Sequence, residues 1–311
     1  MFTKDSRILN NRLTVPLTSV SKAVGDVFKP TLNQLIKSLF ANGEQGFFYD
    51  LNDLSTMFQD TTGLVTGTGQ PVGLMLDKSK GLSLGFERVA NGNFSDVTNW
   101  TGINGTDEVV SNGFLNFISA ATSNPNVSQS GIFEPNKSYK VSFRVDNYVA
   151  GAVYLVAYSS IISEIVSTVQ VSTNGVYTTT IKCPANTTGT LGIRVTSAST
   201  LSITDISVKE VTGNHAYQTT SSMRPLLVAS PQRLDYDTVD DKLITNLPAQ
   251  LTGCTVIRSV PNVGTQSLTG QTIPATYEDN QDHCGLIAIN RALTATETSQ
   301  ITKFFNKAAG V

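Results

Sequence analysis

The chain has 311 residues, long enough for two domains with hydrophobic cores of their own. Only 15% of the residues are charged, the formal net charge is −2 and there is no basic run, so the positive surface that a nucleic acid partner requires is missing. Glycine, serine, threonine and asparagine are frequent, which is typical of β-rich proteins with many turns.

The three cysteines predict neither a disulfide framework nor a metal site. Cys183, Cys254 and Cys284 are odd in number, far apart, and form no C-x-x-C pair. His283 precedes Cys284, but neighbours on a strand point to opposite faces, so these two side chains are not expected to share a metal ion. We expect reduced, packed thiols and no cofactor.

The start of the chain predicts a protein made in the cytoplasm without a signal peptide. Residues 1–20 carry early charges and lack a sustained apolar stretch. No window approaches the roughly 18 apolar residues of a membrane span, so membrane insertion is not expected.

Residues 17–41 carry apolar side chains at helical spacing and predict two helices. Pro30 divides the pattern and stands where it can open the second helix, and Asn42 with Gly43 ends it. We expect residues 1–43 to form a helical arm for attachment or oligomerisation. Packing of the same apolar stripe within the chain remains open beside that interpretation.

Residues 66–81, TGTGQPVGLMLDKSKG, crowd glycines ahead of a lysine in a way that invites comparison with a phosphate-binding loop. In such a loop the lysine follows the last glycine directly and a helix begins there. Here Lys78 comes five residues after Gly73, and Pro71 lacks an N–H donor. We interpret the stretch as a short strand between two turns.

From residue 87 onward, apolar and polar residues alternate, and Asn-Gly pairs at 91–92, 104–105, 112–113 and 174–175 supply the positive φ angles of tight hairpins. In SYKVSFRVDNY the residues expected on one buried face are Tyr139, Val141, Phe143 and Val145. The stretch LGIRV at 191–195 alternates in the same way. A sandwich of antiparallel strands over residues 85–213 is the simplest solution.

The last hundred residues predict short strands and then one helix. Thr294 and Glu297 fit a capping box at its start. The apolar stripe that follows consists of Ile301, Phe304, Phe305 and Ala308. We expect this helix to pack on the sheet that precedes it.

Short motifs occur in order in residues 44–84 and 215–311: GEQGFFYDLNDLSTMFQDTTG, GQPVGLMLDKSKG, MRPLL, LDYDTVDDKLITNLP and LIAINRALTATE. Together they resemble laminin-G or concanavalin-like modules of bacteriophage structural proteins. Two features depart from that pattern, because Thr238 stands where the family has glycine and few residues separate Arg258 from Ile289. The resemblance therefore implies a small or partial sheet.

The middle segment opens with ERVANGNFSDVTNWT and closes with LSITDISVKEV. It resembles the jelly-roll carbohydrate-binding modules appended to glycan-active enzymes and phage fibres, and it is placed as an insertion between the DKSKG and RPLL motifs. Family members often hold calcium through an acidic residue at the position of Ser95, so no metal is predicted here.

Sugar binding needs exposed aromatic rings flanked by polar groups, because the apolar faces of pyranoses stack on such rings. Trp100 follows the opening motif, and Tyr154 and Tyr158 share a strand face with Tyr148 nearby. These four are the candidate glycan-binding residues. A core position for Trp100, and a plain packing role for the tyrosines, remain open alternatives.

The densest acidic run is LDYDTVDDKL, with Asp235, Asp237, Asp240 and Asp241. A glycosidase needs two carboxylates held roughly 5 to 10 Å apart across a cleft, whereas aspartates in a turn commonly hydrogen-bond their own backbone. The run also lacks the glycine and distal glutamate of an EF-hand loop. We predict turn chemistry, no catalytic residue and no metal ligand.

These patterns predict a mainly β protein with two antiparallel β-sandwich or jelly-roll modules, one inserted in the other. The expected parts are an N-terminal helical arm (1–43), a split scaffold (44–84 and 214–311) that ends in a C-terminal helix, and the inserted module (85–213).

The resemblances imply a bacteriophage virion protein without catalysis, in a tail fibre or other appendage, that binds host-surface glycans. Its expected partners are other virion proteins and copies of itself, with a trimer favoured. A tail-associated polysaccharide depolymerase and a purely structural decoration or adaptor protein remain as alternatives.

Overall fold

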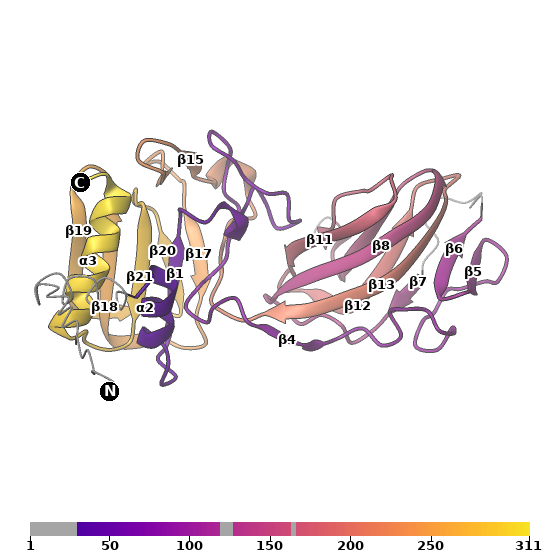
Figure 1. Ribbon diagram of the computed structural model, residues 1–311, viewed down its shortest axis with the longest axis horizontal. Helices are drawn as coiled ribbons and strands as arrows, with labels where there is room; N and C mark the ends of the chain where they lie inside the picture. The colour runs from indigo at the N-terminus through magenta and orange to yellow at the C-terminus, as the bar shows by residue number, and fades with distance from the viewer. Residues whose placement is uncertain (1–29, 119–126, 163–165) are drawn as a thin grey trace, which may run out of the picture.

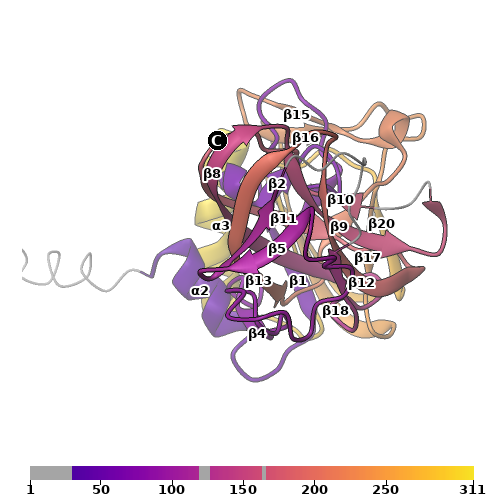
Figure 2. The same ribbon diagram turned by 90° about the vertical axis from the view of Figure 1, so that its right-hand side faces the viewer.

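The computed structural model of the chain describes residues 30–118, 127–162 and 166–311. It is mainly β, as the sequence predicts, and the strands pair in antiparallel fashion. Figure 1 shows two groups of strands side by side along the long axis. Figure 2 looks along that axis, and the two groups overlap in projection. The molecule is therefore elongated, with one group of strands at each end.

One group of strands runs from Leu84 to Val211 and forms two sheets. The larger sheet has the order β11-β8-β13-β6-β5, and β4 pairs with β13. Its strands are β4 (Leu84–Glu87), β5 (Glu108–Ser111), β6 (Phe114–Phe117), β8 (Ser138–Ala150), β11 (Gly175–Lys182) and β13 (Thr200–Val211). The smaller sheet has the order β10-β9-β12-β7, with β7 (Val127–Gln129), β9 (Val153–Ser159), β10 (Val166–Ser167) and β12 (Thr187–Val195).

The two sheets of this group enclose one hydrophobic core. The alternation predicted for SYKVSFRVDNY is confirmed, because Tyr139, Val141, Phe143 and Val145 are buried in that core. The smaller sheet contributes every second residue of β9 and β12 from the opposite side, as expected for a half-buried antiparallel sheet.

Of the Asn-Gly pairs, only 112–113 joins two adjacent, paired strands, β5 and β6. Asn112 and Gly113 both have positive φ angles, 54° and 78°, as a tight hairpin turn requires. The pairs at 91–92 and 104–105 lie in loops, and Gly175 begins β11. The hairpin prediction is therefore wrong for these three pairs, because the same dipeptide also serves in longer connections.

The other group of strands forms three small sheets. The first has the order β1-β21-β18-β19, with β1 (Gly46–Asp50), β18 (Leu251–Val260), β19 (Gly264–Ile273) and β21 (Gly285–Ile289). The second has the order β2-β3-β14-β17-β20, with β2 (Met57–Phe58), β3 (Leu74–Met75), β14 (Ala216–Tyr217), β17 (Leu243–Asn246) and β20 (Thr276–Asp279). The third pairs β15 (Leu226–Val228) with β16 (Arg233–Asp235), and two single 3-10 turns are η1 (Leu54–Thr56) and η3 (Ser221–Met223).

The glycine-rich stretch 66–81 contributes β3 between two turns, which confirms its interpretation as a strand. Lys78, the lysine of that stretch, forms ion pairs with Asp50 at 2.7 Å and Asp53 at 2.9 Å. Its charge is therefore already balanced by two carboxylates.

Two helices cover one face of the sheet that contains β1, as Figure 1 shows. They are α2 (Leu32–Leu39) and α3 (Ala295–Ala309). The predicted capping box of α3, Thr294 with Glu297, is confirmed. Helix α2 begins after Thr31, whose hydroxyl caps it, so Pro30 precedes the cap and does not open the helix. The helix predicted before Pro30 lies outside the described residues. No helix among the described residues is long and apolar enough to cross a bilayer.

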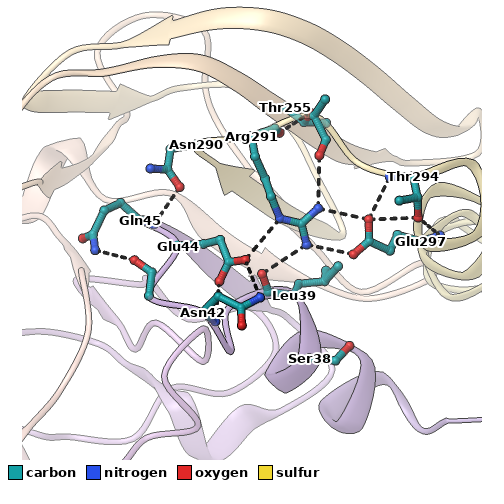
Figure 3. Close-up of polar contacts among 12 residues, drawn as sticks. Ser38, Leu39, Asn42, Glu44, Gln45, Thr255, Asn290, Arg291, Thr294 and Glu297 are labelled. Atoms are coloured by element: carbon teal, nitrogen blue, oxygen red, sulfur yellow. Dashed lines mark hydrogen bonds and ion pairs between the residues drawn. The ribbon is translucent and has the colours of Figure 1, made fainter.

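Arg291 joins the end of α2 to the start of α3, as Figure 3 shows. Its guanidinium donates two hydrogen bonds to Glu297, of 2.8 and 3.0 Å, and one to the carbonyl of Leu39 at 3.3 Å. Glu44 lies 3.4 Å from its Nε. The hydrogen bond from Arg291 lowers the pKa of Glu297 to about 2. The arginine of the NRALTATE motif thus fixes both helices to the sheet.

A buried carboxylate joins the segments that lead into and out of the Leu84–Val211 group. Asp77 is fully buried and accepts backbone hydrogen bonds, each 2.8 Å, from Phe48, Ser79 and Asn214. The hydroxyl of Ser79 adds a fourth. The N–H of Asp77 in turn donates to Nδ1 of His215 at 2.9 Å. Residues 77–79 and 214–215, far apart in sequence, are therefore held together by one acid and one imidazole.

The buried imidazole of His215 should make the free energy of unfolding depend on pH. Burial lowers the pKa of its imidazole to about 4, below the value of about 6.5 in an unfolded chain. Between these values the unfolded state binds more protons, so the free energy of unfolding falls as the pH drops through this window, by roughly 3 kcal/mol in total. Burial raises the pKa of Asp77, which works in the opposite direction and partly offsets the loss near its lower end.

Replacing His215 by glutamine removes this titration. We expect urea unfolding at pH 7, 5.5 and 4.5 to give a flatter pH dependence for His215→Gln than for the natural chain. All other titratable groups are the same in both proteins, so their contributions cancel in the difference. Identical slopes in the two proteins would contradict the assignment.

Candidate functional site

The outward face of the smaller jelly-roll sheet carries two tyrosines and an arginine. On β9, Val153, Leu155 and Ala157 point into the core. Tyr154 and Tyr158 fall on the opposite face and are half-buried, as the sequence predicts for residues that share a face. Each of the two residues therefore keeps part of its surface accessible.

Arg194 joins the two tyrosines on this face because of the strand register. It lies on β12 directly opposite Tyr154. Its Nε donates to the hydroxyl of Tyr158 at 3.0 Å, and its guanidinium lies 5.1 Å from the centre of that ring. Desolvation acts to lower the pKa of Arg194, but the hydrogen bond and the nearby Tyr154 raise it overall, so the group is charged. The three residues define what we call the tyrosine face.

A row of mostly small residues crosses the sheet beside the tyrosine face. The register places Ser167, Val156, Gly192 and Ser128 on four neighbouring strands. The hydroxyl of Ser128 lies 3.0 Å from that of Thr101. Hydroxyl groups thus flank the rings, in an arrangement that offers a sugar both stacking and hydrogen bonds.

Gly192 determines where the ring of Tyr158 lies. A Cβ atom at this position would stand 2.4 Å from Cε2 of Tyr158, so the ring lies against the bare backbone of β12. In Gly192→Ala the ring must move away and its hydrogen bond with Arg194 must lengthen. We expect the free energy of unfolding to fall by about 1 to 2 kcal/mol, with the fold retained.

The check is urea unfolding together with the NMR signal of the Arg194 Nε–H, which should shift. Gly85→Ala is the matched control, since the nearest atom to a Cβ there lies at an ordinary 3.5 Å. Equal behaviour of the two variants would mean that Tyr158 does not depend on the glycine.

Trp100 lies inside the core and not on this face. It is 7% exposed, stacks on Phe94 with ring centres 5.0 Å apart, and donates from Nε1 to the carbonyl of Asn91 at 3.1 Å. Both the ring and the N–H of its indole are engaged within the core, so Trp100 is not part of the site. This is the core alternative that the sequence left open.

Tyr148 lies on β8, in the other sheet of the sandwich. Its ring packs against the core, and its hydroxyl donates to the carbonyl of Gly151 at 3.0 Å. The structure therefore brings together two of the four candidate residues, Tyr154 and Tyr158, and adds Arg194. The sequence does show Arg194 as the one charged residue of LGIRV, at a position that points outward. It does not show that the strand of Arg194 pairs with the strand that carries the two tyrosines.

The acidic run forms the turn that the sequence predicts. Oδ1 of Asp237 accepts the N–H groups of Val239, Asp240 and Asp241 at 2.9 to 3.2 Å. The Val239 N–H lowers the pKa of Asp237. Carboxylate oxygens of Asp237, Asp240 and Asp241 lie within 4.8 Å of one another, and Asp237 and Asp240 are exposed. Asp235 instead pairs with Arg233 at 3.0 Å.

No family model matches the chain, and no curated protein matches it. Similar solved structures include the CBM22-1–GH10 modules of the N-terminal endo-1,4-beta-D-xylanase 10B of Clostridium thermocellum complexed with xylohexaose. The identity is 15%, the match covers 40% of this chain and 29% of that chain, less than a third of its length, and the TM-score is 0.31.

A CBM4 structure is also similar, with 18% identity, 39% of this chain, 99% of that chain and a TM-score of 0.29. The N-terminal CBM22-1–CBM22-2 tandem domain from Paenibacillus barcinonensis is similar too. The identity is 9%, the match covers 70% of this chain and 95% of that chain, and the TM-score is 0.32. All three contain carbohydrate-binding modules, and nothing in them indicates a phage or laminin-G protein. Similarities of this size identify no ligand for this chain.

Proposed function

We propose that the chain is a bacteriophage virion protein, a component of a tail fibre or other appendage, that binds host-surface glycans without catalysing a reaction. The observation that carries the binding part is the tyrosine face, in which Tyr154, Tyr158 and Arg194 lie on one outward sheet face. The virion part is supported by the ordered motifs in residues 44–84 and 215–311, which resemble phage structural modules.

A face of this size binds one sugar chain weakly. Two half-buried rings and one guanidinium offer few contacts, so adhesion would depend on many copies acting together on one particle. Helix α2 packs its apolar face on the chain's own sheet, so in this proposal the part of the N-terminal arm that precedes α2 attaches the protein to other virion proteins or to its own copies, as a trimer. The jelly roll is displayed outward.

The test is an array of bacterial capsule and O-antigen glycans, with the full chain displayed on streptavidin tetramers to reproduce the multiple copies. We expect retention on at least one glycan, and reduced retention of Tyr158→Ala. Absence of binding across host-derived glycans would refute adhesion and favour the structural decoration or adaptor alternative.

The same glycans distinguish an adhesin from a depolymerase. Incubation with the full chain is expected to leave the polysaccharide chain length unchanged. Shortening of the polysaccharide that disappears in Asp237→Asn or Asp240→Asn, with the fold intact, would make the acidic turn catalytic and the proposal wrong.

A further inference from the structure

A cavity of about 410 Å³ lies between the two groups of strands. Its polar lining includes Thr61, Thr62, Asn136, Lys182, Cys183 and Tyr217. Direct contacts hold its walls together, since the N–H of Lys182 donates to the carbonyl of Thr61 at 3.0 Å and the hydroxyl of Thr179 to that of Gly63 at 2.8 Å. The volume is in the range of small-molecule sites.

Lys182, at the end of β11, places an amino group against this cavity with little else to balance its charge. The residue is only 5% exposed. Its Nζ donates to the carbonyl of Asn136 at 2.7 Å and lies 4.2 Å from the ring centre of Tyr217. Among the residues that the structure describes, no carboxylate lies within 4.0 Å of it.

The other titratable groups around Lys182 do not supply the missing negative charge. Lys137 is positive and is paired with Glu210 at 2.8 Å. Burial lowers the pKa of His215 to about 4, so its imidazole is neutral at pH 7. Burial raises the pKa of the Cys183 thiol, so it stays neutral. A buried cation without an anion is unfavourable, because burial disfavours the charged form of the amine. Burial accordingly lowers the pKa of Lys182 to about 8.

We propose that this cavity binds a compact anion, a carboxylate or phosphate group carried by a sugar-sized molecule, with Lys182 as its counter-charge. An ammonium has three donors, and the carbonyl of Asn136 takes one of them. The ring of Tyr217 and the hydroxyls of Thr61 and Thr62 supply an apolar surface and hydrogen-bonding groups for the rest of the ligand.

Binding should depend on pH in one direction. The anion binds the protonated amine, so the affinity for galacturonate, whose carboxylate stays ionised from pH 7 to 9.5, falls by up to tenfold per pH unit above about pH 8. Bound anion should in turn raise the pKa of Lys182.

The experiment is calorimetric titration of the full chain with galacturonate, inorganic phosphate and neutral galactose at pH 7 and 9.5. We expect galacturonate or phosphate to bind, galactose not to bind in this site, and at least a tenfold loss of affinity at pH 9.5. Binding of galacturonate alone identifies an acidic sugar as the ligand, and binding of phosphate alone identifies a phosphate group.

Lys182→Met should bind either anion at least tenfold more weakly, while Lys303→Met, an exposed lysine on α3, should bind as the natural chain does. Arg194→Met should also bind normally. Failure of both anions to bind, or equal binding by Lys182→Met, would overturn the proposal. So would loss of binding in Arg194→Met alone, which would place the anion on the tyrosine face.

A direct measurement covers the case in which Lys182→Met does not fold. Lysine labelled with ¹³C at Cε reports the pKa of Lys182 in the natural chain, with and without galacturonate or phosphate. A rise on addition of either anion supports the proposal, and an unchanged pKa at saturating anion contradicts it.

Discussion

Replacing Asp77 by alanine is expected to lower the free energy of unfolding by about 4 kcal/mol or more. The substitution leaves the buried N–H groups of Phe48 and Ser79 and the partly buried N–H of Asn214 without an acceptor. Each buried group left this way costs about 1 to 3 kcal/mol. A loss of this size is a large fraction of the 5 to 15 kcal/mol typical of folded proteins.

Asp77→Asn should lie between the natural chain and Asp77→Ala, because it keeps one accepting oxygen but turns an amide donor toward the remaining N–H groups. The measurement is urea unfolding at pH 7. Asp240→Ala, at an exposed aspartate in a turn, is the control and should change the free energy of unfolding by less than about 0.5 kcal/mol. If Asp77→Ala unfolds at the same urea concentration as this control, the buried carboxylate does not join the two segments.

Replacing Tyr158 by alanine is expected to weaken glycan binding at least tenfold. A ring that stacks on a sugar contributes on the order of 1.5 to 3 kcal/mol when truncated, and about 1.4 kcal/mol corresponds to a factor of ten in the dissociation constant. The double variant with Tyr154→Ala should abolish measurable binding. Titration calorimetry against the best glycan from the array gives both values.

Tyrosine-to-phenylalanine substitutions separate the hydroxyl from the ring. Tyr158→Phe removes the acceptor of the Arg194 hydrogen bond and should weaken binding a few-fold. Tyr148, on the other sheet, donates its hydroxyl to the carbonyl of Gly151, and Tyr148→Phe should bind glycan as the natural chain does. A larger effect for Tyr148→Phe than for Tyr158→Phe would place the ligand elsewhere.

Local patterns predicted much of this fold. The alternation in β8, the shared face of Tyr154 and Tyr158, and the capping box of α3 all follow from side-chain spacing within one element. They could be predicted because strand and helix periodicity is a property of neighbouring residues.

What the sequence did not predict depends on contacts between distant segments. Arg194 reaches Tyr158 only because β9 and β12 pair in one register. The hydrogen bond between Asp77 and Asn214 and the contact of Lys182 with the ring of Tyr217 both depend on the segment that follows the jelly roll. That segment packs beside residues far from it in sequence. Trp100 shows the same limit, because its stacking on Phe94 depends on how a loop closes over the core.

The measurement that tests the location of glycan binding most directly is an NMR titration of the full chain with the best glycan from the array. Glycan binding at the tyrosine face predicts that the Arg194 Nε–H and the rings of Tyr154 and Tyr158 shift with the same dissociation constant, while Tyr148 stays unchanged. Saturating glycan that leaves the Arg194 signal unmoved, or that shifts residues only on another surface, would contradict it.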